Sequence, residues 1–173
     1  MVLLSRKRNK FNYLRVMNKQ APSTTKILMV CLGNICRSPL AEGILRSKLD
    51  ATLFNVDSVG TGDWHVGNPP DPRSVKVGLS HGVDISGLRG RQLSESDFND
   101  FDHIYVMDQN NLEDVLAKAT TDEQRRKVTM ILDVVFHGEK VDVPDPYHGS
   151  QEDFERVYEM LDTACDHIAK ELA

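Results

Sequence analysis

Cysteine is scarce in this chain of 173 residues, which has three cysteines, at positions 31, 36 and 165. They form no Cys-x-x-Cys pair, and no two histidines stand at the spacing of zinc ligands, so neither a disulfide framework nor a zinc site is expected. A few unpaired thiols favour a reducing, cytoplasmic compartment instead. We expect a protein with no metal and no cofactor.

Long apolar runs and an excess of positive charge are missing as well. No segment approaches the roughly 20 apolar residues that a membrane-spanning helix needs, and the start has no apolar core of a secretory signal. After residue 25 the chain carries 15 Lys and Arg against 26 Asp and Glu. Because nucleic acid calls for a basic face, we expect neither nucleic acid nor a membrane as a partner.

The first 25 residues have a composition of their own, with six Lys and Arg and no acidic residue. Terminal segments of this kind are commonly poorly ordered, so we expect residues 1–25 to be a flexible basic extension. The chain as a whole is 40% hydrophobic and can bury the core of one α/β domain but not of two. That domain is expected to span residues 26–173.

Apolar strands alternate with helices from residue 26 onward. Strands are predicted at 27–30, 54–59, 103–107 and 128–132, and helices after the N-caps Ser38, Asp71 and Ser150 and at 110–119. The alternation predicts a three-layer, Rossmann-like α/β domain, with a four-stranded parallel sheet and helices on both faces. Ligands bind such sheets at the carboxyl ends of the strands.

The segment Val-Cys-Leu-Gly-Asn-Ile-Cys-Arg-Ser-Pro, residues 30–39, follows the first strand directly. A phosphoryl group carries about −1.5 to −2 charges and three acceptor oxygens, so its site needs backbone N–H groups, a helix N-terminus and a guanidinium. Cys31 and Arg37 let one loop supply all of these, and Gly33 is expected to turn the backbone N–H groups inward. A thiol beside a cation and a helix N-terminus is a candidate nucleophile.

The same segment resembles the signature of the low-molecular-weight protein tyrosine phosphatases, and the resemblance covers about residues 26–172. It implies the phosphotyrosine protein phosphatase I type of fold and hydrolysis of phosphotyrosine through a cysteinyl-phosphate, with acid phosphatase activity on aryl phosphates. The implied phosphate-binding loop consists of Leu32, Gly33, Asn34, Ile35, Cys36 and Ser38 around the catalytic Cys31 and Arg37.

The resemblance also implies that the loop is braced by Asn34, Ser38 and Ser58. One position departs from the family pattern, because Leu88 stands where many members have a histidine that bonds to the loop asparagine. We therefore expect a less constrained Asn34, or a substitute partner such as water.

A carboxylic acid is needed to protonate the departing phenolate, whose pKa is near 10. The segment Val-Pro-Asp-Pro-Tyr-His-Gly, residues 143–149, holds Asp145 between two prolines that limit the entropy lost in placing it. Asp-Pro-Tyr resembles the general-acid motif of the same family, so Asp145 is the expected acid and base.

The expected substrate pocket is a slot for an aromatic ring, with Trp64 and Tyr147 as walls. His148 follows Tyr147 where family members often have a second aromatic residue, and it is expected to line the same pocket. His65 is expected to be solvated.

The two remaining cysteines are interpreted differently. The resemblance implies that Cys36 can form a reversible disulfide with Cys31, which would protect the nucleophile from oxidation. Cys165 falls on the apolar stripe of the last helix and is expected in the core.

The sequence leaves three alternatives to a tyrosine phosphatase. A protein-arginine phosphatase resembles Cys-Thr-Gly-Asn-Thr-Cys-Arg-Ser, with a threonine where this chain has the apolar Ile35, which suits an aryl ring better. An arsenate reductase needs further cysteines after the loop, and none lies between Cys36 and Cys165. A non-catalytic phosphotyrosine-binding module would not need Asp145.

The expected partner is a phosphotyrosine-containing protein, with tyrosine kinases among the candidates, and we expect a monomer or a weak dimer.

Overall fold

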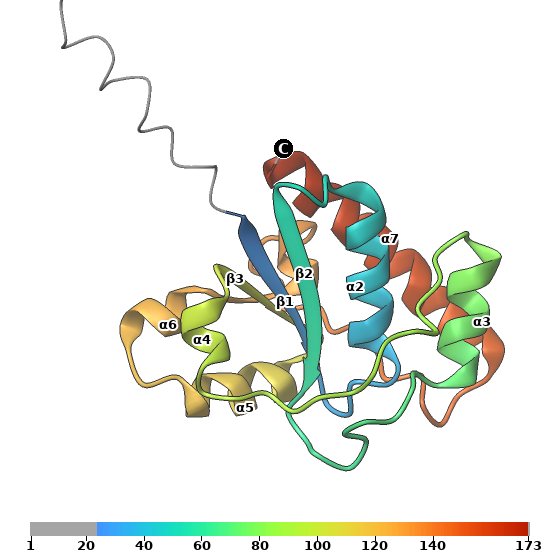
Figure 1. The fold of residues 1–173 in the computed structure, drawn as a ribbon, viewed down its shortest axis with the longest axis horizontal. Coiled ribbons are helices and arrows are strands. Elements are labelled where there is room, and N and C mark those ends of the chain that lie inside the picture. Colours follow the sequence, from blue (N-terminus) through green and yellow to red (C-terminus); the bar gives the residue numbers. More distant parts are fainter. Residues whose placement is uncertain (1–23, 173) are drawn as a thin grey trace, which may run out of the picture.

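Four parallel strands form the centre of the computed structural model, which describes residues 24–172 (Figure 1). They lie in the order β2-β1-β3-β4, with bounds Thr25–Cys31 for β1, Phe54–Gly60 for β2, His103–Val106 for β3 and Val128–Met130 for β4. The predicted parallel sheet is confirmed. The extension predicted at residues 1–25 lies almost wholly outside the described residues.

Helices cover both faces of the sheet, as predicted. On one face lie α2 (Arg37–Lys48) and α7 (Gln151–Leu172), and on the other lies α5 (Gln109–Lys118) (Figure 1). Side chains of β1 alternate between the two layers, since Ile27 and Met29 pack toward α2 and α7 whereas Leu28 and Val30 pack toward α5. The shorter elements are α3 (Pro72–Ser80), α4 (Asp97–Asp100), α6 (Asp122–Arg126) and the 3₁₀ turn η1 (Ile131–Val134).

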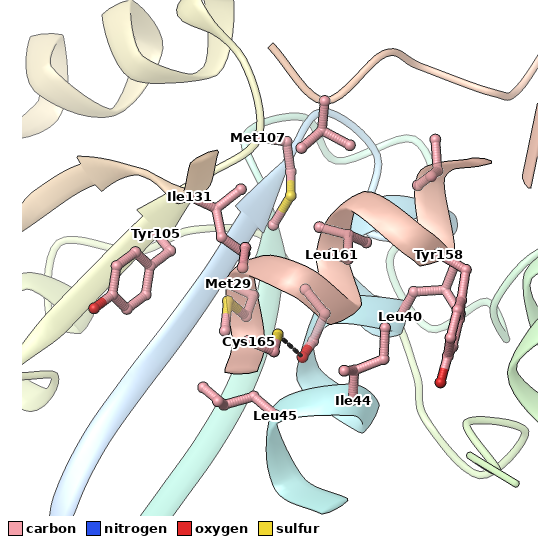
Figure 2. Packing of buried hydrophobic residues seen from close by; sticks show 14 of the residues in the cluster. Met29, Leu40, Ile44, Leu45, Tyr105, Met107, Ile131, Tyr158, Leu161 and Cys165 are labelled. Atoms are coloured by element: carbon pink, nitrogen blue, oxygen red, sulfur yellow. Dashed lines mark hydrogen bonds between the residues drawn. The ribbon is translucent and has the colours of Figure 1, made fainter. Parts of the chain in front are cut away.

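The larger of the two apolar clusters lies between the sheet and the pair α2 and α7 (Figure 2). Cys165 is part of it, fully buried, with its Sγ 3.8 Å from the carbonyl oxygen of Ala41. Burial raises the pKa of this thiol, so it stays protonated and behaves as a small apolar side chain. The predicted core position of Cys165 is confirmed.

Two local predictions were wrong, and two short helices were missed. Helix α2 begins at Arg37, and Ser38 is its second residue rather than its N-cap, because the Ser38 hydroxyl turns toward Cys31 instead. The fourth strand ends at Met130, where the chain enters η1. The short helices α4 and α6 were not predicted. By contrast, Asp71 does cap α3, accepting the backbone N–H of Arg73 at 2.8 Å.

Candidate active site

Cys31 is the last residue of β1, at the carboxyl edge of the sheet, and the chain turns from it directly into α2 (Figure 1). The strand order places β2 on one side of β1 and β3 on the other, so loops from all three strands meet at this edge. Opposite Cys31 in the register is Gly60, where a side chain would collide with the carbonyl oxygen of Leu32. The sheet therefore presents Cys31 at the point where a ligand is expected.

Two hydrogen-bonding groups lie against the sulfur of Cys31. The Ser38 hydroxyl is 3.1 Å from Sγ, and the backbone N–H of Asn34 donates to Sγ over 3.3 Å. These contacts place a hydroxyl and a backbone N–H directly beside the Cys31 sulfur.

Asn34 is the residue that braces the loop. Its Nδ2 donates to Ser38 Oγ at 2.8 Å and to Ser58 Oγ at 2.9 Å, and its Oδ1 accepts the backbone N–H of Arg91 at 2.9 Å. Since Asn34 supplies both protons, the Ser38 hydroxyl can donate its own proton either to Cys31 Sγ or to the carbonyl oxygen of Val59, which is 3.3 Å away. Ser58 in turn donates its proton to the buried Glu42 at 2.5 Å.

Asn34 has the substitute partner that was expected in place of a histidine. That partner is the backbone N–H of Arg91 rather than water, and Leu88 packs against the core. Asn34 also adopts the left-handed conformation, with φ 55°. Asparagine tolerates this conformation better than most residues. At Gly33 the missing side chain makes room for the ring of His65, which a Cβ would meet at 3.0 Å.

Arg37 is almost fully buried and is held by an acidic partner that the sequence analysis missed. Its Nη1 donates to Asp108 at 2.5 Å and to the carbonyl oxygen of Val143 at 3.0 Å, and its Nη2 donates to Asp145 at 3.1 Å. Burial acts to lower the pKa of Arg37, but the negative charges around it outweigh burial and raise that pKa. Asp108 lies two residues after the end of β3, at the carboxyl edge of the sheet, which is the signal that could have pointed to it.

Asp145 lies between the end of η1 and α7, with its side chain 44% exposed. One carboxylate oxygen faces Arg37, and the other accepts the backbone N–H of Tyr147 at 3.1 Å. The start of this segment is tied to the sheet, because Val143 donates its N–H to the carbonyl oxygen of Met107. More than a hundred residues separate Asp145 from Cys31 in sequence, and the fold brings both to one cavity.

That cavity has a volume of about 260 Å³, and the predicted nucleophile, acid, guanidinium and pocket walls all line it. The lining residues are Cys31, Leu32, Gly33, Ile35, Cys36, Arg37, Trp64, His65, Asp145, Tyr147 and His148. The expectation that His65 is merely solvated was wrong. Asn34, Ser38 and Ser58 lie behind the lining as buried supports.

Trp64 and Tyr147 form the exposed rim of the cavity. Trp64 is 68% exposed, and its ring lies over Gly62, where a Cβ would stand 1.9 Å from the indole carbon Cζ3. The ring of Tyr147 is 5.0 Å from that of His148, edge to face. Among residues 24–172, no three His, Cys, Asp or Glu side chains are grouped so as to hold a metal ion.

Replacing Gly62 with alanine is expected to displace the Trp64 ring from its position over residue 62 and to weaken substrate binding. Loss of stacking, at about 0.5–1.5 kcal/mol, corresponds to a rise in KM of about 2- to 12-fold with little change in kcat. The chain has one tryptophan, so its fluorescence reports the displacement. Gly87→Ala is the control, because a Cβ there meets open space. A shifted fluorescence with an unchanged KM would remove Trp64 from the substrate wall.

Comparisons with known proteins agree on one family. The model of the family described as low molecular weight phosphotyrosine protein phosphatase matches residues 26–173. The Schizosaccharomyces pombe protein of the same name is 39% identical over 153 residues, which are 86% of this chain and 97% of that protein. Among the described residues, no helix is both long and apolar enough to cross a membrane.

Solved structures give the same result. A protein tyrosine phosphatase of Entamoeba histolytica, with Hepes in its active site, superimposes with a TM-score of 0.81 at 35% identity, over 86% of this chain and 97% of that one. Vibrio vulnificus Wzb in complex with benzylphosphonate gives a TM-score of 0.78 at 32% identity, over 86% and 99% of the two chains. The chain belongs to the low molecular weight phosphotyrosine protein phosphatase family.

Proposed function

We propose that the protein hydrolyses phosphotyrosine in proteins through a cysteinyl-phosphate intermediate. The observation that carries this proposal is the convergence of Cys31, Arg37 and Asp145 on one cavity with an aromatic rim. A thiolate, a bidentate guanidinium and a carboxyl group are the three parts that transfer of a phosphoryl group to sulfur and then to water requires.

The proposed first step is attack of the Cys31 thiolate on phosphorus, in line with the tyrosine oxygen. Arg37 and the loop N–H groups hold the nonbridging oxygens, and Ser38 steadies the sulfur. Asp145 gives its proton to the departing phenolate. A phosphate held by Arg37 competes with Asp145 for the same guanidinium, which frees the carboxyl group to face the leaving oxygen.

The proposed second step returns the thiolate. Asp145, now ionised, takes a proton from a water molecule that attacks the cysteinyl-phosphate, and the sulfur leaves with its electron pair. Phosphate is released, and Asp145 is again protonated for the next substrate. The same sequence would hydrolyse small aryl phosphates, which gives the expected acid phosphatase activity.

Phosphotyrosine is favoured over phosphoserine by the aromatic rim of Trp64 and Tyr147, and over phosphoarginine by the lining of the cavity. Ile35 presents an apolar side chain to the cavity, where an aryl ring gains contact and a guanidinium would lose its hydration. The benzylphosphonate bound by the related Wzb combines a ring with a phosphonate, which supports the same preference here.

Side-by-side assays on peptides that differ only in phosphotyrosine, phosphoserine or phosphoarginine test this function. We expect rapid release of phosphate from the first peptide alone. Hydrolysis of phosphoarginine at a higher rate would favour the arginine phosphatase reading. An arsenate reductase is disfavoured because the third cysteine, Cys165, is fully buried between α2 and α7, out of reach of a disulfide relay.

We also infer the compartment, the partners and the oligomeric state of the protein. The three free, buried cysteines suit a reducing compartment, so we expect a cytoplasmic enzyme that acts on phosphotyrosine proteins, with tyrosine kinases among the candidates. A monomer or a weak dimer is expected, and sedimentation over a range of protein concentrations would measure which.

Peroxide is expected to link Cys31 to Cys36 slowly. Peroxide first converts the Cys31 thiolate to a sulfenic acid; the Cys36 thiolate then attacks that sulfur and displaces hydroxide. Burial raises the pKa of Cys36 well above its ordinary value, so the attacking thiolate is scarce and the rate should rise about tenfold per pH unit above neutrality. Mass mapping of peroxide-treated protein across a pH series measures this. Irreversible inactivation without a Cys31–Cys36 link would contradict the protective role.

A further inference from the structure

The first turn of α3 is fastened to the phosphate-binding loop. The backbone N–H of Asp71 donates to the carbonyl oxygen of Ile35 at 2.8 Å, and the hydroxyl of the buried Ser74 donates to the carbonyl oxygen of Cys36 at 3.3 Å. These two bonds join α3 to the part of the loop between Cys31 and Arg37. The start of α3 therefore keeps a fixed position relative to the nucleophile.

Arg73, on the same turn, reaches the opposite wall of the site. Its Nη2 donates to the carbonyl oxygen of Tyr147 at 2.9 Å, and its Nη1 donates to that of Gly149 at 3.1 Å. These carbonyls lie two and four residues after Asp145, and the N–H of Tyr147 donates to the Asp145 carboxylate. One side chain thus holds the segment that carries the proposed acid.

The guanidinium of Arg73 is itself held in place. Its Nε and Nη2 donate to the two carboxylate oxygens of Asp71 at 3.0 and 2.8 Å, and its Cζ lies over the ring of Phe154, 4.5 Å from the ring centroid. Hydrogen bonding from Arg73 lowers the pKa of Asp71. Such a fork, fixed by a bidentate carboxylate and an aromatic face, cannot be reproduced by lysine.

We propose that Arg73 is a positioning residue, which sets the distance between Asp145 and the Cys31 loop by bridging α3 to residues 145–149. Arg73 is not among the described residues that line the cavity, so it acts through Asp145 rather than on the substrate. This inference rests on the proposed function, because it assigns a purpose to the position of the proposed acid. A displacement of about 1 Å can cost up to 10²-fold in rate.

The test is a series of aryl phosphates that runs from activated nitrophenols to unactivated phenols, with kcat/KM measured for each. If Arg73 positions the acid, Arg73→Met lowers kcat/KM by about 10- to 10²-fold for phenyl phosphate and barely changes it for nitrophenyl esters, which leave without a proton. Arg73→Lys is also expected to lower kcat/KM for phenyl phosphate more than for nitrophenyl esters. It replaces the methionine variant in the test if that variant does not fold. Arg156→Met is the matched control, because Arg156 forms an exposed ion pair with Asp153 on α7.

The double variant of Arg73→Met with Asp145→Asn separates positioning from general stability. Once the acid is gone, loss of Arg73 should have no further effect on kcat/KM, whereas a purely structural role would give additive losses. Equal losses for all esters, or additive losses in the double variant, would overturn the role of Arg73. If Asp145→Asn itself leaves the dependence on the leaving group unchanged, it is the proposed function that fails.

Discussion

A Cys31→Ser variant is expected to lose at least about 10⁴-fold in the hydrolysis of phosphotyrosine peptide, the size of effect that removal of a nucleophile has in other covalent enzymes. The reason lies in what surrounds the sulfur. The groups placed against Sγ are the Ser38 hydroxyl and the Asn34 N–H. They can hydrogen-bond to the sulfur, but neither is a base that could remove the proton of a serine hydroxyl.

Binding should survive this substitution, because Arg37 and the loop backbone are unchanged. The measurements are steady-state turnover of a phosphotyrosine peptide and titration calorimetry of the same peptide with the variant. Cys165→Ala is the control for loss of a thiol away from the site. Turnover by the serine variant above a few per cent of the parent rate would show that Cys31 is not the nucleophile, and undiminished binding without turnover is the expected pattern.

An Asp145→Asn variant is expected to lose about 10²- to 10⁴-fold in kcat/KM for phosphotyrosine and phenyl phosphate, the contribution typical of general acid catalysis. Asparagine has nearly the same shape and keeps one of the two acceptor oxygens, which serve Arg37 and Tyr147 in the parent, but it has no acidic proton to give to a phenolate. Esters of nitrophenols should be far less affected, because their leaving groups are stable as anions. The split between the two ester classes identifies the step in which Asp145 acts.

Asp142→Asn is the matched control for this experiment. Asp142 lies three residues earlier, is exposed, and accepts the backbone N–H of Gln109 at the start of α5. It should leave turnover within about twofold of the parent, as expected for surface substitutions. Near-normal turnover of phosphotyrosine peptide by Asp145→Asn would show that Asp145 is not the general acid.

The architecture of this protein could be predicted because its determinants are local. The first strand contains a continuous apolar run, the second alternates apolar with polar residues, and the phosphate-binding loop is contiguous, so residues 30–39 display nearly the whole cradle in one segment. Asp145 was found although it is remote, because two prolines and a tyrosine mark its position. Errors included which residue caps α2, where the fourth strand ends and whether His65 lines the cavity.

The contacts that could not be predicted join residues far apart through atoms that leave no mark in a sequence. Arg91 holds Asn34 by a backbone N–H, across 57 positions, and every residue except proline offers the same donor. Arg73 bonds to two backbone carbonyls more than 70 positions away. Asp108 is an ordinary acidic residue until the sheet order places β3 beside β1.

The direction of β1 has a practical consequence for handling the enzyme. The strand begins at Thr25 and ends at Cys31, so its first residue lies about 20 Å from the nucleophile at the usual rise per residue. The last turn of α7 lies at the same edge of the sheet as Thr25 (Figure 1). A purification tag, a surface linker or a fusion partner that is joined at Thr25 or after Leu172 therefore starts at the edge of the sheet opposite Cys31.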